Sequence, residues 1–241
     1  PPSLTRKDSS AASDVYKRRH WEESQKKIFE SKKVKFLKTH NSLIKAFGYD
    51  FTQPKYTLGV IYIIRDPRNV ITSIKNHYQL DDEKAIQWIG NKENYIYDVQ
   101  NFEESGYGDF QYISSWSLNY KSWKVQKKIP IKFIKYEDLL DKTYIVFLEI
   151  IEFINKITNN SKKIDKVKLK NVLRTTSFEA LKKNEIDKGF SEAIAYRENK
   201  NKKIPFFHLG PKNDWKTILN KELKIKLEKL FEKELKELSY I

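Results

Sequence analysis

The order of its apolar segments predicts an α/β fold, a parallel sheet wrapped by helices. Thr57–Ile64 is a continuous, β-branched-rich run bounded by turn residues, as in a strand buried on both faces. Ile131–Lys135 is a second short strand, entered through Pro130. Segments with a helical repeat of apolar positions follow each run. Because alternating strands and helices form parallel sheets that helices cover, we expect that architecture here.

Local signals give the first elements and the start of the first long helix. Before the first strand we expect a helix at Trp21–Phe29, a loosely alternating strand at Val34–Thr39 and a loop at Asn41–Pro54. After it, Asp66 is a good N-cap, and Pro67 takes the first helical position, where its missing N–H costs nothing. We expect this helix to run to about Tyr78.

The later segments are mostly helical. We expect helices at Asp81–Ile89, Tyr112–Gln126, Tyr144–Ile157, Lys163–Leu173 and Phe178–Lys188. Trp116, Tyr120 and Trp123 share one helical face, which predicts a core position for them. A last helix, Lys221–Leu238, carries one apolar stripe and is expected to dock on the core. With no repeat, no Gly/Ser linker and no boundary, we expect one domain over residues 1–241.

The composition excludes several classes of protein. The chain has 241 residues, is 39% hydrophobic and therefore encloses a globular core. Its net charge is +15, but only seven of the 47 basic residues are arginine, and the lysines are scattered. A groove that stacks bases needs clustered arginines and aromatic residues, so we expect no nucleic-acid partner.

The absence of cysteine and methionine and the short apolar runs lead to three further expectations. Without cysteine there is no disulfide and no cysteine nucleophile, which suits a cytoplasmic protein. The longest apolar run, Leu58–Ile64, is far shorter than the roughly 20 residues that span a bilayer, so we expect no membrane partner. The chain opens Pro-Pro and has no methionine, so we expect it to be N-terminally incomplete.

An anion site is predicted after the first buried strand. In open α/β sheets, ligands bind beyond the carboxyl ends of the strands. Arg65 lies at that edge, and the next helix presents its N-terminus there. Ser73 follows about 10 Å further along the helix, so a long arginine folding back could share one phosphate with it. The alternative is that Arg65 pairs with Asp66 or another carboxylate and Ser73 is an ordinary helical residue.

A second pair of residues suggests proton transfer. Lys38 and His40 are two positions apart on the expected strand, so both side chains would point to one face. A cation beside an imidazole suits a site where an anion reacts and a proton is removed. The four histidines, His20, His40, His77 and His208, have no metal-ligand spacing, so we expect no metal.

Five segments in order resemble the PAPS-dependent sulfotransferases of the cytosolic type, and especially their bacterial members with a Lys-Thr-His-Asn segment. PAPS is 3′-phosphoadenosine 5′-phosphosulfate. The matching segments are Phe36–Ser42, Ile61–Ser73, Phe133–Leu139, Thr175–Glu179 and Gly210–Lys216. The resemblance implies a P-loop-like sulfotransferase fold. It also implies transfer of a sulfuryl group from PAPS, as co-substrate, to a hydroxyl or amine of a small-molecule acceptor.

The resemblance also assigns roles. His40 matches the catalytic base, and Lys38 matches the cation beside the sulfuryl group. The residues that match the family's nucleotide-binding positions are Arg65 and Ser73 for the 3′-phosphate, Tyr136 for the adenine, and Thr176 and Phe178 for bonding and stacking of the adenosine. His208-Leu209-Gly210 aligns with the family's Arg-Lys-Gly phosphate clamp.

The sequence departs from the family at three places. Both cations of the clamp are replaced, which leaves the Gly210 N–H and Lys212 to bind the phosphate. The family's Lys-Ser-Gly-x-Thr loop for the 5′-phosphosulfate is absent from the sequence, in keeping with an N-terminally incomplete chain. The dimer motif is not reproduced after Lys216, so no oligomeric state is predicted. An inert nucleotide- or polyanion-binding module is the second hypothesis, and a P-loop kinase relative is a disfavoured third.

Overall fold

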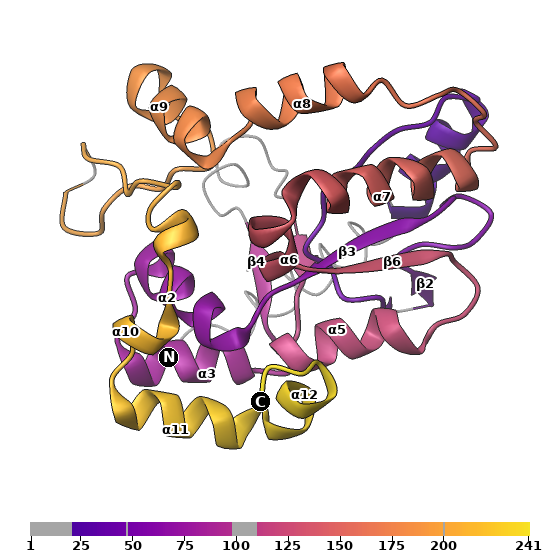
Figure 1. Cartoon of the computed structure of the whole chain (residues 1–241). Helices are drawn as coiled ribbons and strands as arrows, with labels where there is room; N and C mark the ends of the chain where they lie inside the picture. Colours follow the sequence, from indigo (N-terminus) through magenta and orange to yellow (C-terminus); the bar gives the residue numbers. More distant parts are fainter. Residues whose placement is uncertain (1–20, 47, 98–109, 200) are drawn as a thin grey trace. The chain divides into compact units, whose positions relative to one another are not determined.

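The computed structural model describes residues 21–46, 48–97, 110–199 and 201–241 (Figure 1). The chain divides into two compact units, each built from two separate stretches of sequence. The first unit comprises residues 1–60 and 90–130, and the second comprises residues 61–89 and 131–241. No helix of the described residues is long and apolar enough to cross a membrane.

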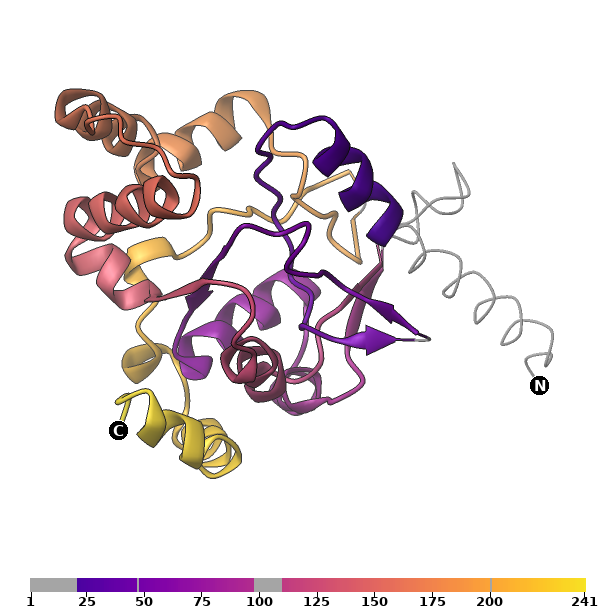
Figure 2. The same ribbon diagram turned by 90° about the vertical axis from the view of Figure 1, so that its right-hand side faces the viewer.

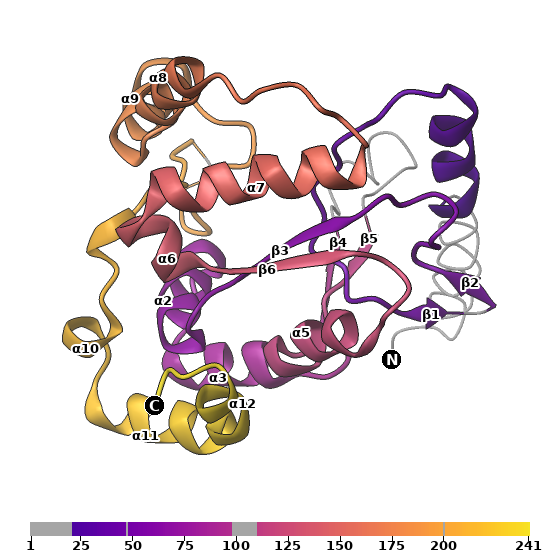
Figure 3. The same cartoon turned by 45° about the vertical axis from the view of Figure 1, so that its right-hand side comes forward.

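The second unit is built on two parallel strands that helices cover. Strands β3 (Val60–Ile64) and β6 (Ile131–Lys135) pair, and helix α7 (Thr143–Ile157) packs against β6, as Figure 3 shows. Ile134 of β6 and Val146 and Ile150 of α7 form a buried cluster, onto which Ile61 of β3 packs. The predicted α/β class is therefore confirmed, and β6 has the predicted bounds.

Helix α2 (Pro67–Tyr78) leaves the carboxyl end of β3 as predicted. The Asp66 carboxylate accepts a hydrogen bond from the Arg68 N–H at 2.9 Å, and Pro67 opens the helix. One face of α2 is buried through Ile71 and Ile74. The strand and the cap together fix where the backbone turns at Arg65, because Asp66 and Pro67 are both fully buried.

The remaining helices of the second unit mostly follow the prediction. They are α3 (Asp82–Gly90), α6 (Tyr136–Asp141), α8 (Lys166–Thr175), α9 (Phe178–Lys188), the 3₁₀ turn η1 (Gly210–Lys212), α10 (Trp215–Ile218), α11 (Lys221–Leu230) and α12 (Glu232–Glu237). The single helix expected at Lys221–Leu238 is wrong, because the chain breaks at the fully buried Phe231. Figure 2 shows the two resulting helices, in yellow, beside each other. Their stripe is buried at Leu223, Leu227 and Leu235, as expected.

The first unit combines small antiparallel pairs with helices. Residues 21–30 are helical, in agreement with the prediction. Its other elements are the pair β1 (Lys45–Ala46) and β2 (Tyr49–Asp50), the pair β4 (Tyr95–Tyr97) and β5 (Phe110–Tyr112), and helix α5 (Trp116–Val125). Tyr120 and Trp123 of α5 are buried and Trp116 is half-buried, so two of the three residues of the predicted aromatic stripe lie in the core.

Three predictions for the first unit were wrong. The helix expected at Tyr112–Gln126 begins only at Trp116, after the Ser115 cap, because Tyr112 belongs to β5. Residues 34–39 are not a strand, and Val34, Phe36 and Leu37 are 55%, 74% and 69% exposed. A strand needs a neighbouring backbone to bond, whereas the hydrogen bonds at the end of this segment go to side chains. The loop expected at Asn41–Pro54 instead holds the β1–β2 pair.

Candidate active site

Arg65 lies against Tyr136 in the second unit. The guanidinium carbon is 4.3 Å from the centroid of the Tyr136 ring, close enough for a cation–π contact. Tyr136 is the first residue of α6, directly after β6, so adjacent parallel strands bring the two residues to one sheet edge. Burial lowers the pKa of the Arg65 guanidinium, while the charges of Glu137 and Asp66 oppose that shift. A partly dehydrated cation attracts an anion more strongly than one in bulk water does.

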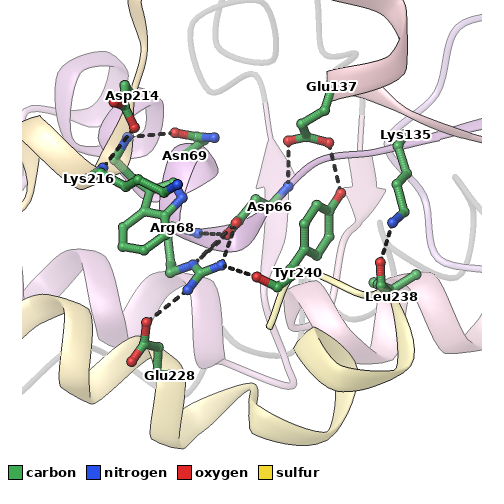
Figure 4. Close-up of polar contacts among 11 residues, drawn as sticks. Asp66, Arg68, Asn69, Lys135, Glu137, Asp214, Lys216, Glu228, Leu238 and Tyr240 are labelled. Carbon is green, nitrogen blue, oxygen red and sulfur yellow. Dashed lines mark hydrogen bonds and ion pairs between the residues drawn. The ribbon is translucent and has the colours of Figure 1, made fainter.

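Polar contacts of Asp66, the residue after Arg65, hold this sheet edge in place (Figure 4). One oxygen of the Glu137 carboxylate accepts the Asp66 N–H at 3.2 Å, and the other accepts the Tyr240 hydroxyl at 2.9 Å. Burial and the Glu137 charge raise the pKa of Tyr240 above its usual value, so its hydroxyl stays a donor. The backbone turn after Arg65 is thereby tied to the next strand through α6 and to residue 240.

Arg68 is the centre of a second, buried set of contacts in the same view (Figure 4). Its guanidinium makes a two-pronged ion pair with Asp66, and Nη1 contacts Glu228 at 2.8 Å. Nη2 also donates to the Tyr240 carbonyl oxygen at 3.1 Å. Asn69 accepts the Trp215 N–H and so joins α10 to the same helix. The start of α2 is therefore fixed by α10 and α11.

Ser73 is exposed and lies on α2, as the predicted anion site requires. Arg65 and Ser73 both belong to the second unit. Arg65 directly follows β3, and Ser73 lies in the middle of α2. Whether they share a phosphate remains a prediction.

A second group of predicted residues gathers around Phe178, the first residue of α9. Gly210 has φ +55°, which favours glycine, and a Cβ there would overlap the Phe178 ring. Phe178 also meets Phe207 edge-on, with ring centroids 6.1 Å apart. The predicted adenosine-stacking residue and the predicted clamp glycine are therefore neighbours.

Two side chains of α9 hold the segment that leads to Gly210. The Glu185 carboxylate accepts the backbone N–H groups of Phe206 and Phe207 at 2.7 and 2.9 Å. Lys182 Nζ donates to the His208 carbonyl oxygen at 3.2 Å. Residues 206–210 are thereby fixed along one helix.

The other predicted residues near this group are peripheral. Thr176 is the C-cap residue that follows α8, and its hydroxyl donates to the Val172 carbonyl oxygen at 2.8 Å. Leu209 accepts the Lys212 N–H at 3.1 Å within the η1 turn, and the side chains of His208 and Lys212 are exposed. The exposed side chains of His208 and Lys212 are accessible to an anion, but no contact described above fixes their orientation.

Lys38 and His40 lie in the first unit and are both exposed. The backbone of His40 is held on both sides. Its N–H donates to Gln111 Oε1 at 2.7 Å, and its carbonyl oxygen accepts from Asn119 Nδ2 at 3.0 Å. The shared strand face expected for the pair is not present, because this segment is not a strand.

The two residues after His40 anchor it in the first unit. Asn41 and Ser42 are buried, and Trp123 Nε1 donates to the Asn41 carbonyl oxygen at 2.9 Å. The Asn41 carboxamide oxygen accepts the Tyr112 N–H at 2.8 Å. Next to them lies an open hollow of about 510 Å³, lined by residues that include Ser42, Ile44, Lys92, Leu118, Lys121 and Val125. The exposed His40 thus stands on a rigid base, two residues before Ser42, which lines the hollow.

Sequence reasoning missed Glu137, Arg68, Tyr240, Lys182 and Glu185. Arg68 and Glu137 lie inside two of the segments that resemble the sulfotransferases, Ile61–Ser73 and Phe133–Leu139, so their position in these motifs was an available signal. Lys182 and Glu185 are ordinary charged residues of an amphipathic helix, and only the packing of residues 206–210 on α9 distinguishes them. Among the described residues, no group of His, Asp or Glu is arranged to hold a metal ion.

The second unit is thus an α/β assembly that presents Arg65 and Tyr136 at the edge of its sheet and packs Phe178 against Gly210 beside α9. The family model described as "Sulfotransferase domain" matches residues 3–239. The chain therefore belongs to the sulfotransferase family.

Individual relatives are distant. The chain is 26% identical over 182 residues to a flavonol sulfotransferase-like protein of Flaveria bidentis, covering 73% of this chain and 54% of that protein. It is also similar to the crystal structure of mouse sulfotransferase SULT7A1 complexed with PAP. That match has a TM-score of 0.48 and 17% identity, and covers 74% of this chain and 58% of that one. The chain thus spans somewhat more than half the length of these relatives.

Proposed function

We propose that the protein transfers a sulfuryl group from PAPS to a hydroxyl or amine of a small-molecule acceptor. One observation carries the proposal beyond family membership. The second unit brings Arg65 against Tyr136 and Phe178 against Gly210, although these residues are far apart in the sequence. Both pairs combine an aromatic face with an anion-binding group, which is the chemistry that a phosphorylated adenosine needs.

Each member of these pairs has a role in binding the donor. Arg65 takes the 3′-phosphate, with Ser73 as a second donor from α2. Tyr136 and Phe178 contact the adenine, Thr176 bonds the adenosine, and Gly210 offers its backbone N–H in the 208–210 clamp. Glu137 and Glu185 act as positioning residues, since their contacts fix the backbone beside Arg65 and before Gly210.

The reaction itself is a single in-line displacement. The acceptor oxygen or nitrogen forms a bond to sulfur while the bond from sulfur to the bridging phosphate oxygen breaks, and adenosine 3′,5′-bisphosphate leaves. His40 takes the proton of the acceptor as attack proceeds, because imidazole is a base suited to neutral pH. Lys38 neutralises part of the charge that develops on the transferring and leaving groups.

The acceptor is proposed to have an apolar body. The hollow beside Ser42 is lined by Ile44, Leu118 and Val125, with Lys92 and Lys121 among its other walls. Apolar walls with a few polar groups favour small organic molecules, and the lysines together with Glu93, which also lines the hollow, favour one with a polar edge.

The test combines binding and turnover on the full chain. Adenosine 3′,5′-bisphosphate at 100 times its dissociation constant should stabilise the fold by about 2.7 kcal/mol, a clear rise in melting temperature. Sulfate transfer from PAPS to a panel of phenols, alcohols and amines should then be measurable. Binding without transfer to any acceptor would favour the inert nucleotide-binding module, and no stabilisation at millimolar nucleotide would remove the proposal.

A further inference from the structure

One face of α9 is the support for residues 206–210. Phe178, Lys182 and Glu185 are spaced four and three residues apart, so they lie on the same side of the helix. Each of the three contacts the segment: Glu185 at Phe206 and Phe207, Lys182 at His208, and Phe178 at Gly210. The segment therefore follows this face of α9, and any ligand of Gly210 also lies near Lys182.

The charge of Lys182 is not used for folding in the way that the charge of Glu185 is. Both oxygens of the Glu185 carboxylate are taken by backbone N–H groups. Lys182 makes one hydrogen bond to a neutral carbonyl oxygen, and its Nζ lies 5.8 Å from the centroid of the Phe178 ring. Within the described part of the chain, no carboxylate forms an ion pair with Lys182. A full positive charge is thus held beside the ring and the glycine.

The 208–210 segment itself lacks the cation that a phosphate needs. Leu209 is apolar, and His208 has an exposed side chain. A phosphate held only by the Gly210 N–H would have one uncharged donor and no cation to balance its negative charge. A cation fixed at this place would supply what the segment lacks.

We propose that Lys182 is the phosphate-binding cation of this segment and binds a phosphate of the adenine nucleotide together with the Gly210 N–H. The proposal rests on the proposed function, because it takes the nucleotide as the ligand. An ammonium has three donors, so one can stay on the His208 carbonyl oxygen while another bonds a phosphate oxygen. Lys182 would then fix both the segment and its ligand.

The experiment measures binding of adenosine 3′,5′-bisphosphate to the full chain by calorimetry. Lys182→Ala and Lys182→Gln should both weaken binding by about tenfold or more, the range for hydrogen bonds to charged groups. The glutamine keeps a donor for the His208 carbonyl oxygen but has no charge, so it separates phosphate binding from support of the segment. Lys182→Arg should restore affinity to within about threefold. Lys183→Ala, the neighbouring exposed lysine, is the matched control and should bind as the wild type does.

Two results would overturn the proposal. If Lys182→Gln binds as tightly as the wild type, Lys182 only supports the segment. If Lys183→Ala loses as much affinity as Lys182→Ala, the effect is general surface charge. Both results require a wild type that binds the nucleotide, and a wild type that does not bind it fails the proposed function itself.

Discussion

The guanidinium of Arg68 lies over the indole of Trp215, with its central carbon 3.8 Å from the ring centroid. The same group is paired with Asp66 and Glu228, and its side chain is only 2% exposed. Arg68 therefore has an aromatic face on one side and carboxylates at its edge. It joins the N-cap of α2 to α10 and α11, which makes it a structural arginine, unlike Arg65 three residues earlier.

Removing Arg68 should be costly for folding. Arg68→Ala leaves the buried Asp66 carboxylate without its cation, and breaking a buried pair from one side costs about 3–5 kcal/mol. Urea unfolding should show a large drop in the midpoint. Lys226→Ala, which removes only an exposed pair with Glu83 and Glu222, should leave the midpoint near that of the wild type. Equal midpoints for both variants would contradict this account.

Arg65→Ala should have the opposite profile, with nucleotide affinity affected more than stability. Loss of a charge-assisted bond to phosphate should weaken adenosine 3′,5′-bisphosphate by about 10- to 100-fold. Binding of 5′-AMP, which has no 3′-phosphate, should change little. Arg174→Ala removes an exposed arginine of α8 in the same unit and serves as the control. A parallel loss for both nucleotides would disprove the 3′-phosphate assignment.

His40→Ala should separate catalysis from binding. Removal of a general base typically lowers turnover by about 10²–10⁴-fold, and His40 stands outside the unit that holds Arg65. Affinity for adenosine 3′,5′-bisphosphate should therefore stay near that of the wild type. The measurement is sulfate transfer from PAPS on an accepted substrate, with calorimetry alongside. Near-normal turnover would show that another group removes the proton.

Two glycines with positive φ allow a matched test of the Phe178 contact. Gly189→Ala (φ +76°) has open space around the new methyl group, so only backbone strain of about 1 kcal/mol is expected. Gly210→Ala (φ +55°) has similar strain but also displaces the Phe178 ring. It should be less stable than Gly189→Ala and should bind the nucleotide more weakly. Identical behaviour of the two variants would argue against the packing of Gly210 on Phe178.

The half-buried His77 should make folding sensitive to acid. Burial lowers its pKa below the ordinary 6.5, partly offset by Glu192. Between the folded and unfolded pKa values the unfolded state binds more protons, so stability rises with pH and is lost as pH falls below about 6.5. His77→Phe keeps an aromatic ring against Tyr78 and Phe206 and should flatten this slope between about pH 5 and 7 in urea unfolding. An unchanged slope in His77→Phe would contradict the assignment to His77.

Elements whose ends depend on local chemistry could be predicted from the sequence. Helix α2 has its predicted bounds because Asp66 and Pro67 define its start without help from distant residues. Helix α9 likewise begins after the Ser177 cap and ends before Gly189, as expected. The strand predicted at residues 34–39 was wrong for the opposite reason, because a strand forms only where the backbone of a partner strand lies beside it.

In the candidate site, too, the residues whose position depends on local sequence order could be predicted, and those that depend on distant packing could not. Arg65 was predicted to lie at the carboxyl edge of a strand because strand and helix order alone determine that edge. The contact of Lys182 and Glu185 with residues 206–208 depends on how a segment more than twenty residues away packs, and no local pattern encodes it. For the same reason the break of the last helix at Phe231 was not visible in a continuous apolar stripe.

The contacts around Arg68 also determine when during synthesis this part of the molecule can be completed. Its partners Glu228 and Tyr240 follow 160 and 172 positions later in the chain. At about 5–20 residues per second, a ribosome needs roughly 10–30 s to make that stretch. During that interval the strand–helix turn at Arg65 has emerged, yet α10, α11 and residue 240 do not exist to enclose it. The nascent chain therefore carries an Arg68 that has Asp66 but not yet Glu228 or the Tyr240 carbonyl oxygen, together with an uncovered apolar face of α2, and transiently exposed apolar surface is what chaperones protect.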